Sequence, residues 1–199
     1  MKCFVPLLVA TTILAASALP LAQAQATEYE VDPLHSSIIF SVTHMNAGNV
    51  YGAFTEFEGD FSYDPENSAE NAIHMTVNTA SVNTFVEARD DHLRNDDFFN
   101  APEFPAMSFT STGWEPVEGA SGVYEVSGDF TLLEVTKPIT AKATVIGQNT
   151  HRDGTPMMGL EFTFVVKRSD FGMDFSLENL SDEIPVVVAV EGIAKVEVE

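Results

Sequence analysis

Cysteine is almost missing from this chain, and its single copy, Cys3, lies at the extreme amino terminus. An apolar run from Phe4 to Leu19 follows, with Lys2 before it and Ala22-Gln23-Ala24 after it. A short basic start, an apolar middle and an Ala-x-Ala end are typical of a secretory signal peptide. The alternative is a membrane anchor, but the run is shorter than the ~20 residues that a spanning helix needs.

We therefore expect residues 1–24 to be a cleaved signal peptide and the protein to be exported, with cleavage after Ala26 as the second choice. Removal of Cys3 leaves no thiol, which excludes disulfides, thiolate metal sites and a cysteine nucleophile. The mature chain must then be held together by its core alone. The about 175 residues that remain are enough for one core and one domain.

Basic residues are also scarce, with nine Lys and Arg against 30 Asp and Glu. The formal charge of the whole chain is -21, and removal of Lys2 with the signal peptide makes it more negative by one unit. Such a surface repels nucleic acid and anionic membranes, so we expect no nucleic-acid partner. No later segment is long and apolar enough to span a bilayer, so we expect no stable membrane insertion.

Catalytic and metal-binding motifs are lacking as well. There is no Gly-x-Ser-x-Gly elbow, no glycine-rich phosphate loop and no carboxylate pair that stands out as an acid–base couple. The histidines have no His-x-x-x-His or His-Glu-x-x-His spacing; they are His35, His44, His74, His92 and His151. We expect no catalytic residues, no metal, no cofactor and no enzymatic activity.

Alternating apolar and polar residues fill most of the mature chain. In 56–63, for example, Phe57, Gly59, Phe61 and Tyr63 alternate with polar residues. This period of two is typical of a strand with one apolar face. Similar rows occupy 36–44, 73–78, 107–110, 126–132, 139–145, 160–166 and 186–198, separated by turn residues. Regular strands joined by short turns predict an antiparallel sandwich or barrel.

One segment breaks this rhythm. Residues 86–95 are polar, dense in charge and rich in helix formers, and Thr84 and Glu87 have the spacing of a capping box. We predict a short helix from Phe85 to about Asn95. Its charged cluster, Arg89 to Arg94, has two interpretations: a polar rim at a pocket mouth, or ion pairs that tie the helix to the sheet.

Phenylalanine is abundant, with fifteen copies, and many fall on the apolar faces. Two interpretations remain open from alternation alone: a densely packed core, or a barrel lined with apolar side chains around one small ligand.

Several sequence strings, taken together, resemble the YceI-like polyisoprenoid-binding family. They cover nearly the whole mature chain: Tyr29–His44, Gly52–Gly59, Val82–Phe99, Phe104–Phe109, Gly128–Leu132 with Val135–Ile139, and Arg168–Met173. One departure is Leu133-Glu134, because family members often have a glycine before the Val-Thr-Lys-Pro run.

The resemblance implies an all-β, lipocalin-like antiparallel barrel of about eight strands, spanning 27–199, with one short helix after the fourth or fifth strand. It implies a periplasmic protein that sequesters or transports a polyisoprenoid of quinone or polyprenyl type, or another long-chain amphiphile. The alternatives are an accessory protein in quinone redox or stress response that acts through a membrane partner, and an enzyme acting on such a lipid. A homodimer could form through an open strand edge.

The resemblance and the alternation together predict the binding residues. The expected pocket lining is Phe40, Val42, Phe57, Phe61, Met75, Val77, Phe98, Phe99, Phe109, Phe130, Phe162 and Phe164. The residues expected at the pocket mouth, near the ligand head group, are Arg89, Asp90, His92 and Arg94.

Overall fold

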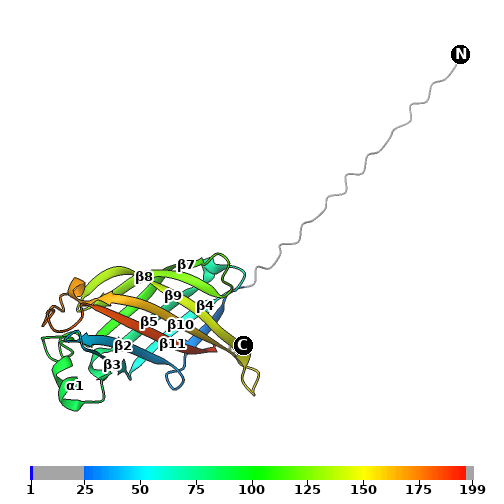
Figure 1. Ribbon diagram of the computed structural model, residues 1–199. Helices are drawn as coiled ribbons and strands as arrows, with labels where there is room; N and C mark the ends of the chain where they lie inside the picture. The colour runs from blue at the N-terminus through cyan, green and yellow to red at the C-terminus, as the bar shows by residue number, and fades with distance from the viewer. Residues whose placement is uncertain (2–24, 196–199) are drawn as a thin grey trace.

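Eight antiparallel strands form a closed ring in the computed structural model, which describes Met1 and residues 25–195. The ring closes because β1 pairs with both β4 and β11. In ring order, the strands are β1 (Thr27–Val31), β4 (Phe57–Tyr63), β5 (Ala72–Asn78), β7 (Ala106–Pro116), β8 (Val123–Leu132), β9 (Val135–Thr150), β10 (Pro156–Lys167) and β11 (Glu183–Ala194). The predicted eight-stranded barrel is confirmed (Figure 1).

Three further strands extend one end of this ring: β2 (Ser37–His44), β3 (Gly48–Phe54) and β6 (Val82–Asn83). β11 pairs with β1 near its carboxyl end and with β2 along its earlier half. β2 in turn pairs with β3, as β1 pairs with β4. Thus β1 and β2 act as two halves of one bent strand, and β3 and β4 as two halves of the next.

Two hairpins turn through non-glycine residues in the left-handed region. Met45 and Asn46 turn the chain between β2 and β3, where Ala47 completes the loop, and Leu133 and Glu134 join β8 to β9; all four have φ between 51° and 59°. Two successive residues of positive φ make a type I′ turn, whose twist matches that of the flanking strands. The departure from the family pattern at Leu133-Glu134 therefore leaves a tight hairpin intact, at the cost of a strained backbone.

The single α-helix, α1, is shorter than predicted and spans Glu87–Leu93. Its N-cap is Val86, whose side chain makes no capping bond, so the predicted capping box is wrong. Thr84 instead donates its hydroxyl to Asp90 within the helix, at 2.5 Å. Phe85 between them has a φ of 68°, which no helix can continue. Short 3-10 turns occur at Ser68–Glu70 (η1), Thr79–Ser81 (η2) and Arg168–Phe171 (η3).

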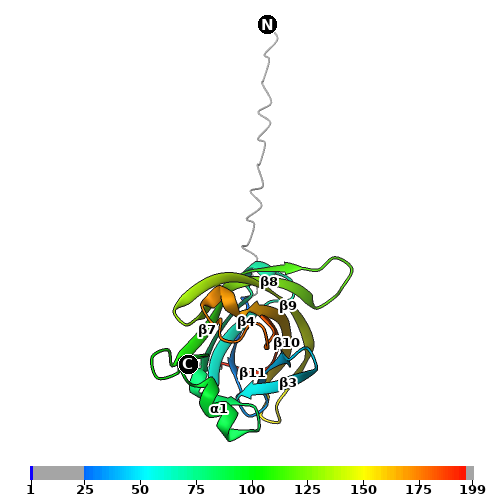
Figure 2. The ribbon, with the colours of Figure 1, turned by 60° about the vertical axis from the view of Figure 1, so that its left-hand side comes forward.

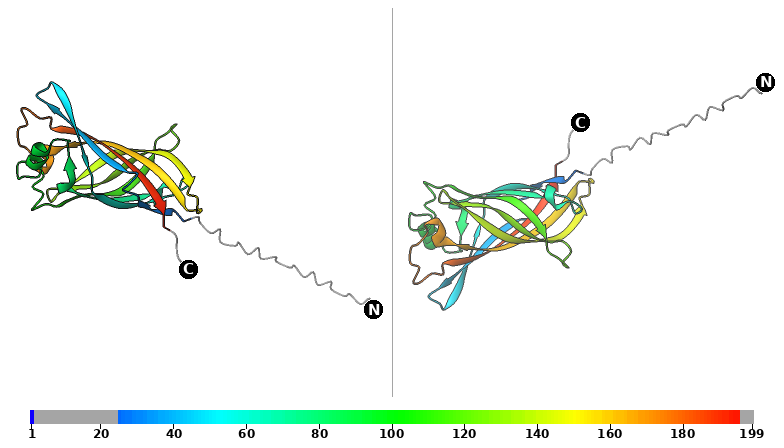
Figure 3. Two further views of the ribbon diagram at one scale, coloured as in Figure 1. Left: turned by 90° about the horizontal axis from the view of Figure 1, so that it is seen from below. Right: turned by 90° about the horizontal axis from the view of Figure 1, so that it is seen from above.

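The two ends of the barrel are built differently (Figures 1 and 3). α1, the β2–β3 hairpin and the segment 172–182 gather at one end, and Figure 2 brings that end forward. The start of β1 and the end of β11 lie at the opposite end, where Tyr29 pairs with Ala194. We call the first the α1 end and the second the far end.

Aromatic side chains close the far end from inside. Tyr29 stacks on Phe61 with ring centroids 4.8 Å apart, and the Tyr63 and Tyr124 hydroxyls lie 3.0 Å apart. Trp114 packs edge-on against Tyr124 at 5.6 Å. Burial raises the pKa of both Tyr29 and Tyr63, so these hydroxyls stay neutral. We call these five residues the aromatic plug.

Helices long and apolar enough to cross a membrane are not found among the described residues.

Candidate functional site

A cavity of about 730 Å³ occupies the barrel interior. Its walls are formed mainly by aliphatic and aromatic side chains from the ring strands, from β2 and β3, and from the segments at the α1 end. The lining residues that are exposed to solvent all lie at the α1 end: His44 and Met45 on the β2–β3 hairpin, His92 on α1, and Phe175 on the segment 172–182. The cavity therefore opens at the α1 end, while the aromatic plug lies beyond its other end.

Most residues predicted to line a pocket do line this cavity. They come from five strands and from the loop after α1: Phe40, Val42, Met75, Val77, Phe98, Phe99, Phe109, Phe130, Phe162 and Phe164. Alternation brings them together because every second side chain of a barrel strand points inward. Their contact with a ligand stays a prediction.

Phe57 and Phe61 are placed elsewhere and do not line the cavity. Both lie on β4, which belongs to the far half of the barrel. Phe61 is only 1% exposed and belongs to the aromatic plug, while Phe57 is partly buried against the core. Phe61 is buried as predicted, but its ring stacks on Tyr29 within the aromatic plug. Phe57 lies opposite Val77, which lines the cavity, and packs against the core without lining the cavity itself.

Arg89 and His92 lie at the cavity mouth, as predicted. They are three residues apart and so share one face of α1. Arg89 donates from Nε to the Thr84 hydroxyl and from Nη2 to the Thr84 carbonyl, both at 2.7 Å. The ring of His92 packs edge-on against Phe98 and Phe175, and its Nε2 lies 2.8 Å from the Asp97 carboxylate.

Asp90 and Arg94, in contrast, face away from the cavity, which corrects the expected mouth position. They are four residues apart on the neighbouring face of α1, which packs on the chain before the helix. Asp90 is buried and accepts from the amide and hydroxyl of Thr84. Arg94 donates to the carbonyls of Ala80 and Val82. For these two residues the structural interpretation holds: they fasten the helix to the barrel.

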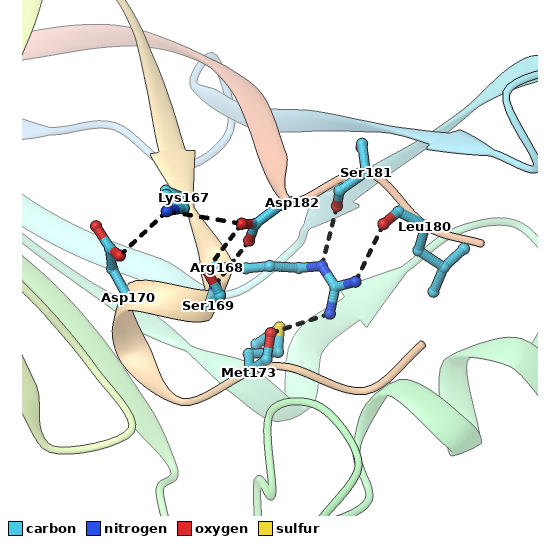
Figure 4. Close-up of polar contacts among 8 residues, drawn as sticks. All are labelled: Lys167, Arg168, Ser169, Asp170, Met173, Leu180, Ser181 and Asp182. Atoms are coloured by element: carbon cyan, nitrogen blue, oxygen red, sulfur yellow. Dashed lines mark hydrogen bonds and ion pairs between the residues drawn. The ribbon is translucent and has the colours of Figure 1, made fainter. Parts of the chain in front are cut away.

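Arg168 is a buried, charged lining residue that sequence reasoning overlooked, along with apolar ones such as Phe54 and Ile73 (Figure 4). It opens η3 directly after β10, and only 3% of the residue is exposed. Burial lowers the pKa of its guanidinium, against the opposing charges of Asp182 and Asp174. Arg168 begins the Arg168–Met173 string that supported the family resemblance, but a single arginine at a strand end carries no signal of its own.

The neighbouring carboxylate, Asp182, is engaged with other groups. It accepts from the Ser169 amide at 2.9 Å and from the Ser169 hydroxyl at 2.8 Å, and it lies 4.0 Å from the Lys167 ammonium. Although burial opposes the shift, these hydrogen bonds hold the pKa of Asp182 below its usual range. The cluster anchors the start of η3 to the segment that leads into β11 (Figure 4).

One group of side chains outside the cavity has the composition of a metal site. Asp32, His35 and Glu191 offer donor atoms that all lie within 4.8 Å of one another on the outer wall. The His35 ring nitrogen is 2.6 Å from the Asp32 carboxylate, and this bond raises the pKa of His35. His35 is exposed, while Asp32 and Glu191 are partly buried. The hydrogen bond already accounts for the arrangement, so the absence of a metal stays a prediction.

Comparisons with known proteins agree with this architecture. The model of the YceI-like domain matches residues 29–192. The protein YceI of Escherichia coli O157:H7 is 36% identical over 172 residues, which is 85% of this chain and 88% of that protein. The crystal structure of the Campylobacter jejuni YCEI protein superposes with a TM-score of 0.70 at 32% identity, covering 77% of this chain and 90% of that one.

A more distant structure shares the fold. It is a polyisoprenoid binding domain from Saccharophagus degradans implicated in plant cell wall breakdown, with a TM-score of 0.65 and 18% identity. The match covers 84% of this chain and 98% of that domain.

Proposed function

This chain belongs to the YceI-like family, and from that membership and the shape of its interior we propose that it binds a long-chain isoprenoid or similar amphiphilic lipid inside the barrel. The observation that carries the proposal is the apolar cavity of about 730 Å³, closed by the aromatic plug and open at the α1 end. Its size falls within the range of about 300–1,000 Å³ typical of small-molecule pockets. The related Saccharophagus domain is described as polyisoprenoid binding, which supports the same ligand class.

Transfer of the lipid tail out of water would supply most of the affinity. Each buried CH₂ contributes about 0.8 kcal/mol, so a few isoprene units bind without many polar contacts. Placing the tail in the cavity leaves the head group beside Arg89 and His92 at the mouth. The protein would then sequester the tail and carry the lipid through water, as a binding protein and not as an enzyme.

We further propose that this transport takes place in the periplasm. The basis is the signal-peptide pattern of residues 1–24, which lies outside the described part of the chain, apart from Met1. The strongly acidic composition suits a soluble carrier of an insoluble cargo.

The first test is to purify the protein from its own host after export, record a native mass spectrum, and identify what organic extraction releases. A stoichiometric isoprenoid or long-chain lipid supports the proposal. A ligand-free mass, together with no uptake of added polyprenyl lipid or quinone, would refute it.

A matched pair of variants tests whether the cavity is the binding site. Ala141 lines the cavity on β9 and is 2% exposed, while its neighbour Thr140 is exposed on the outer wall. Ala141→Phe should fill the cavity and lower lipid uptake at least about tenfold, since it removes apolar contacts equivalent to several CH₂ groups. Thr140→Phe adds the same ring outside and should bind lipid normally.

A further inference from the structure

The mouth of the cavity carries a fixed positive charge. Arg168 donates through Nε to the Ser181 carbonyl at 2.9 Å, through Nη1 to the carbonyls of Met173 and Phe175 at 3.0 and 2.9 Å, and through Nη2 to the Leu180 carbonyl at 3.2 Å. Figure 4 shows the guanidinium among the Met173, Leu180 and Ser181 carbonyls. These bonds hold one rigid cation against the cavity wall.

The hydrogen-bond partners of the Arg168 guanidinium are neutral backbone carbonyls, whereas a buried guanidinium is usually paired with a carboxylate. Buried arginines are normally paired with an acid, because an isolated charge is costly to remove from water. Among the ion pairs of the described residues, none joins the Arg168 guanidinium to a carboxylate within 4.0 Å. Asp182 and Asp174 act on it only from farther away. Carbonyl dipoles solvate the charge but do not neutralise it.

Arginine N–H groups are left over for a ligand. A guanidinium has five N–H donors. In the described part of the chain, the four bonds of Arg168 leave one N–H of Nη2 without an acceptor. Arg89 binds Thr84 through Nε and Nη2, which leaves both Nη1 hydrogens and one Nη2 hydrogen without an acceptor there. Both arginines line the cavity.

The cavity wall has a charge of the opposite sign to the rest of the protein. The chain carries 30 acidic residues against nine Lys and Arg, yet the described lining includes neither Asp nor Glu. Its ionisable members are Arg89, Arg168, His44 and His92. His44 forms a β-bridge with Leu180, and the ring of His92 packs on Phe175. Arg168 donates hydrogen bonds to the carbonyls of both Leu180 and Phe175. These groups therefore form one cluster at the mouth.

We propose that this cluster is an oxyanion site, and that the lipid in the cavity has a carboxylate or phosphate head group bound by Arg168 and Arg89. The proposal rests on the proposed function, because the tail must occupy the cavity to bring the head to the mouth. It deepens that function by selecting an anionic amphiphile over a neutral quinone or alcohol. Charge-assisted hydrogen bonds to arginine are shorter and stronger than neutral ones, and they gain from a poorly solvated site.

The test compares ligands that share a tail and differ only in the head. The mature protein, purified after export, is titrated calorimetrically with farnesyl phosphate and farnesol, and with oleate and oleyl alcohol. The anionic member of at least one pair should bind about 10- to 100-fold more tightly, the range expected of a charge-assisted hydrogen bond. The pair that shows the preference distinguishes a phosphate head from a carboxylate head.

Variants assign the preference to the mouth. Arg168→Gln and Arg89→Gln should each reduce the anion-to-alcohol ratio severalfold and leave alcohol binding nearly unchanged. Arg152→Gln, on the exposed β9–β10 turn, removes the same charge away from the cavity and should leave the ratio intact. If Arg168→Gln fails to fold, Arg89→Gln and the salt dependence of the wild-type ratio decide the question.

The outcomes separate the two proposals. Equal binding of the acid and alcohol in both pairs would overturn the oxyanion site and leave the lipid-binding proposal standing. A ratio that Arg152→Gln lowers as much as the mouth variants would also overturn it, since the effect would then come from net charge. Binding of neither member of either pair would overturn lipid binding itself.

Discussion

Replacement of Gly128 by alanine tests how tightly the barrel wall is packed. Gly128 lies on β8, and the ring of Phe109 from the neighbouring strand β7 lies across it. An added Cβ would come within 2.5 Å of Phe109 Cε2 and 2.6 Å of the Thr110 carbonyl oxygen, and closer still to Phe109 Cζ. Carbon atoms in proteins do not approach so closely, so both neighbours must move.

The cost of this substitution follows from which atoms must move. The Phe109 ring can rotate toward the cavity that it lines, but the Thr110 oxygen belongs to the backbone of a paired strand. Overpacking of this kind costs about 1–3 kcal/mol. We expect about 2 kcal/mol for Gly128→Ala, because the gain from a less flexible unfolded chain, about 0.4–1 kcal/mol, offsets part of the strain. For a domain of this size, that corresponds to a Tm lower by roughly 4–8 °C.

The assay is urea unfolding of three proteins: wild type, Gly128→Ala and the control Gly147→Ala. A Cβ at Gly147 on β9 meets nothing within 4 Å, so the control should be neutral or slightly stabilising. Phe109→Leu removes both clashing ring atoms, so the double variant should show a coupling of about 0.5–3 kcal/mol with Gly128→Ala. Equal stability of Gly128→Ala and Gly147→Ala would refute the packing argument.

Three further predictions concern single hydrogen bonds. Asp32→Asn should lower the pKa of His35, which its hydrogen bond to Asp32 now raises, and an NMR titration that finds it unchanged would contradict this pairing. The pKa of His35 is raised and that of Asp32 is lowered, so the pair stabilises the fold between about pH 4 and pH 6.5. The stabilisation is lost as pH rises through the folded-state pKa of His35 or falls through that of Asp32, so melts of variant and wild type should converge at alkaline pH. Tyr63→Phe should lower the free energy of unfolding, measured by chemical denaturation, by about 1–3 kcal/mol, because it leaves the buried Tyr124 hydroxyl without its partner. Adding Tyr124→Phe to the same chain should recover much of this loss. A second loss that simply adds to the first would argue against the bond. Thr84→Val should speed hydrogen exchange of the α1 amides, since it removes the hydroxyl that joins the helix to β6, while exchange in β9 stays unchanged as the control.

Alternation identified the strands and their inward faces because both depend on local geometry. A side chain two residues along a strand returns to the same face whatever the rest of the chain does. This is why Phe109, Phe130 and Phe162 were placed on the interior from sequence alone. Height along the barrel axis depends instead on which strands pair and in what register. That is why Phe61 was assigned to the pocket although it lies in the aromatic plug.

The helix shows a second limit of local reasoning. Thr84 and Glu87 have the spacing of a capping box, but the Thr84 hydroxyl is taken by Asp90 and by Arg89. These bonds to residues five and six positions further along the chain replace the cap, because Phe85 with its positive φ turns the Thr84 side chain away from the N3 position. Arg168 was overlooked for a related reason, since its four acceptors come from residues 173–181 through the fold of the loop, and no spacing in the sequence encodes that arrangement.

The aromatic plug also bears on the kinetics of exchange. A lipid bound in a cavity with one opening enters tail first and leaves head first. Each additional isoprene unit inside the cavity must be drawn out past the apolar wall, so a longer tail should give a longer residence time. Differences in affinity among related ligands usually appear in the dissociation rate. Tail length should therefore slow release until the tail reaches Tyr29, Phe61, Tyr63, Trp114 and Tyr124, after which added units remain in water. The closed end of the barrel therefore limits the tail length that contributes to binding. A partner that removes the lipid must first bind its head group, which is the only part exposed at the opening.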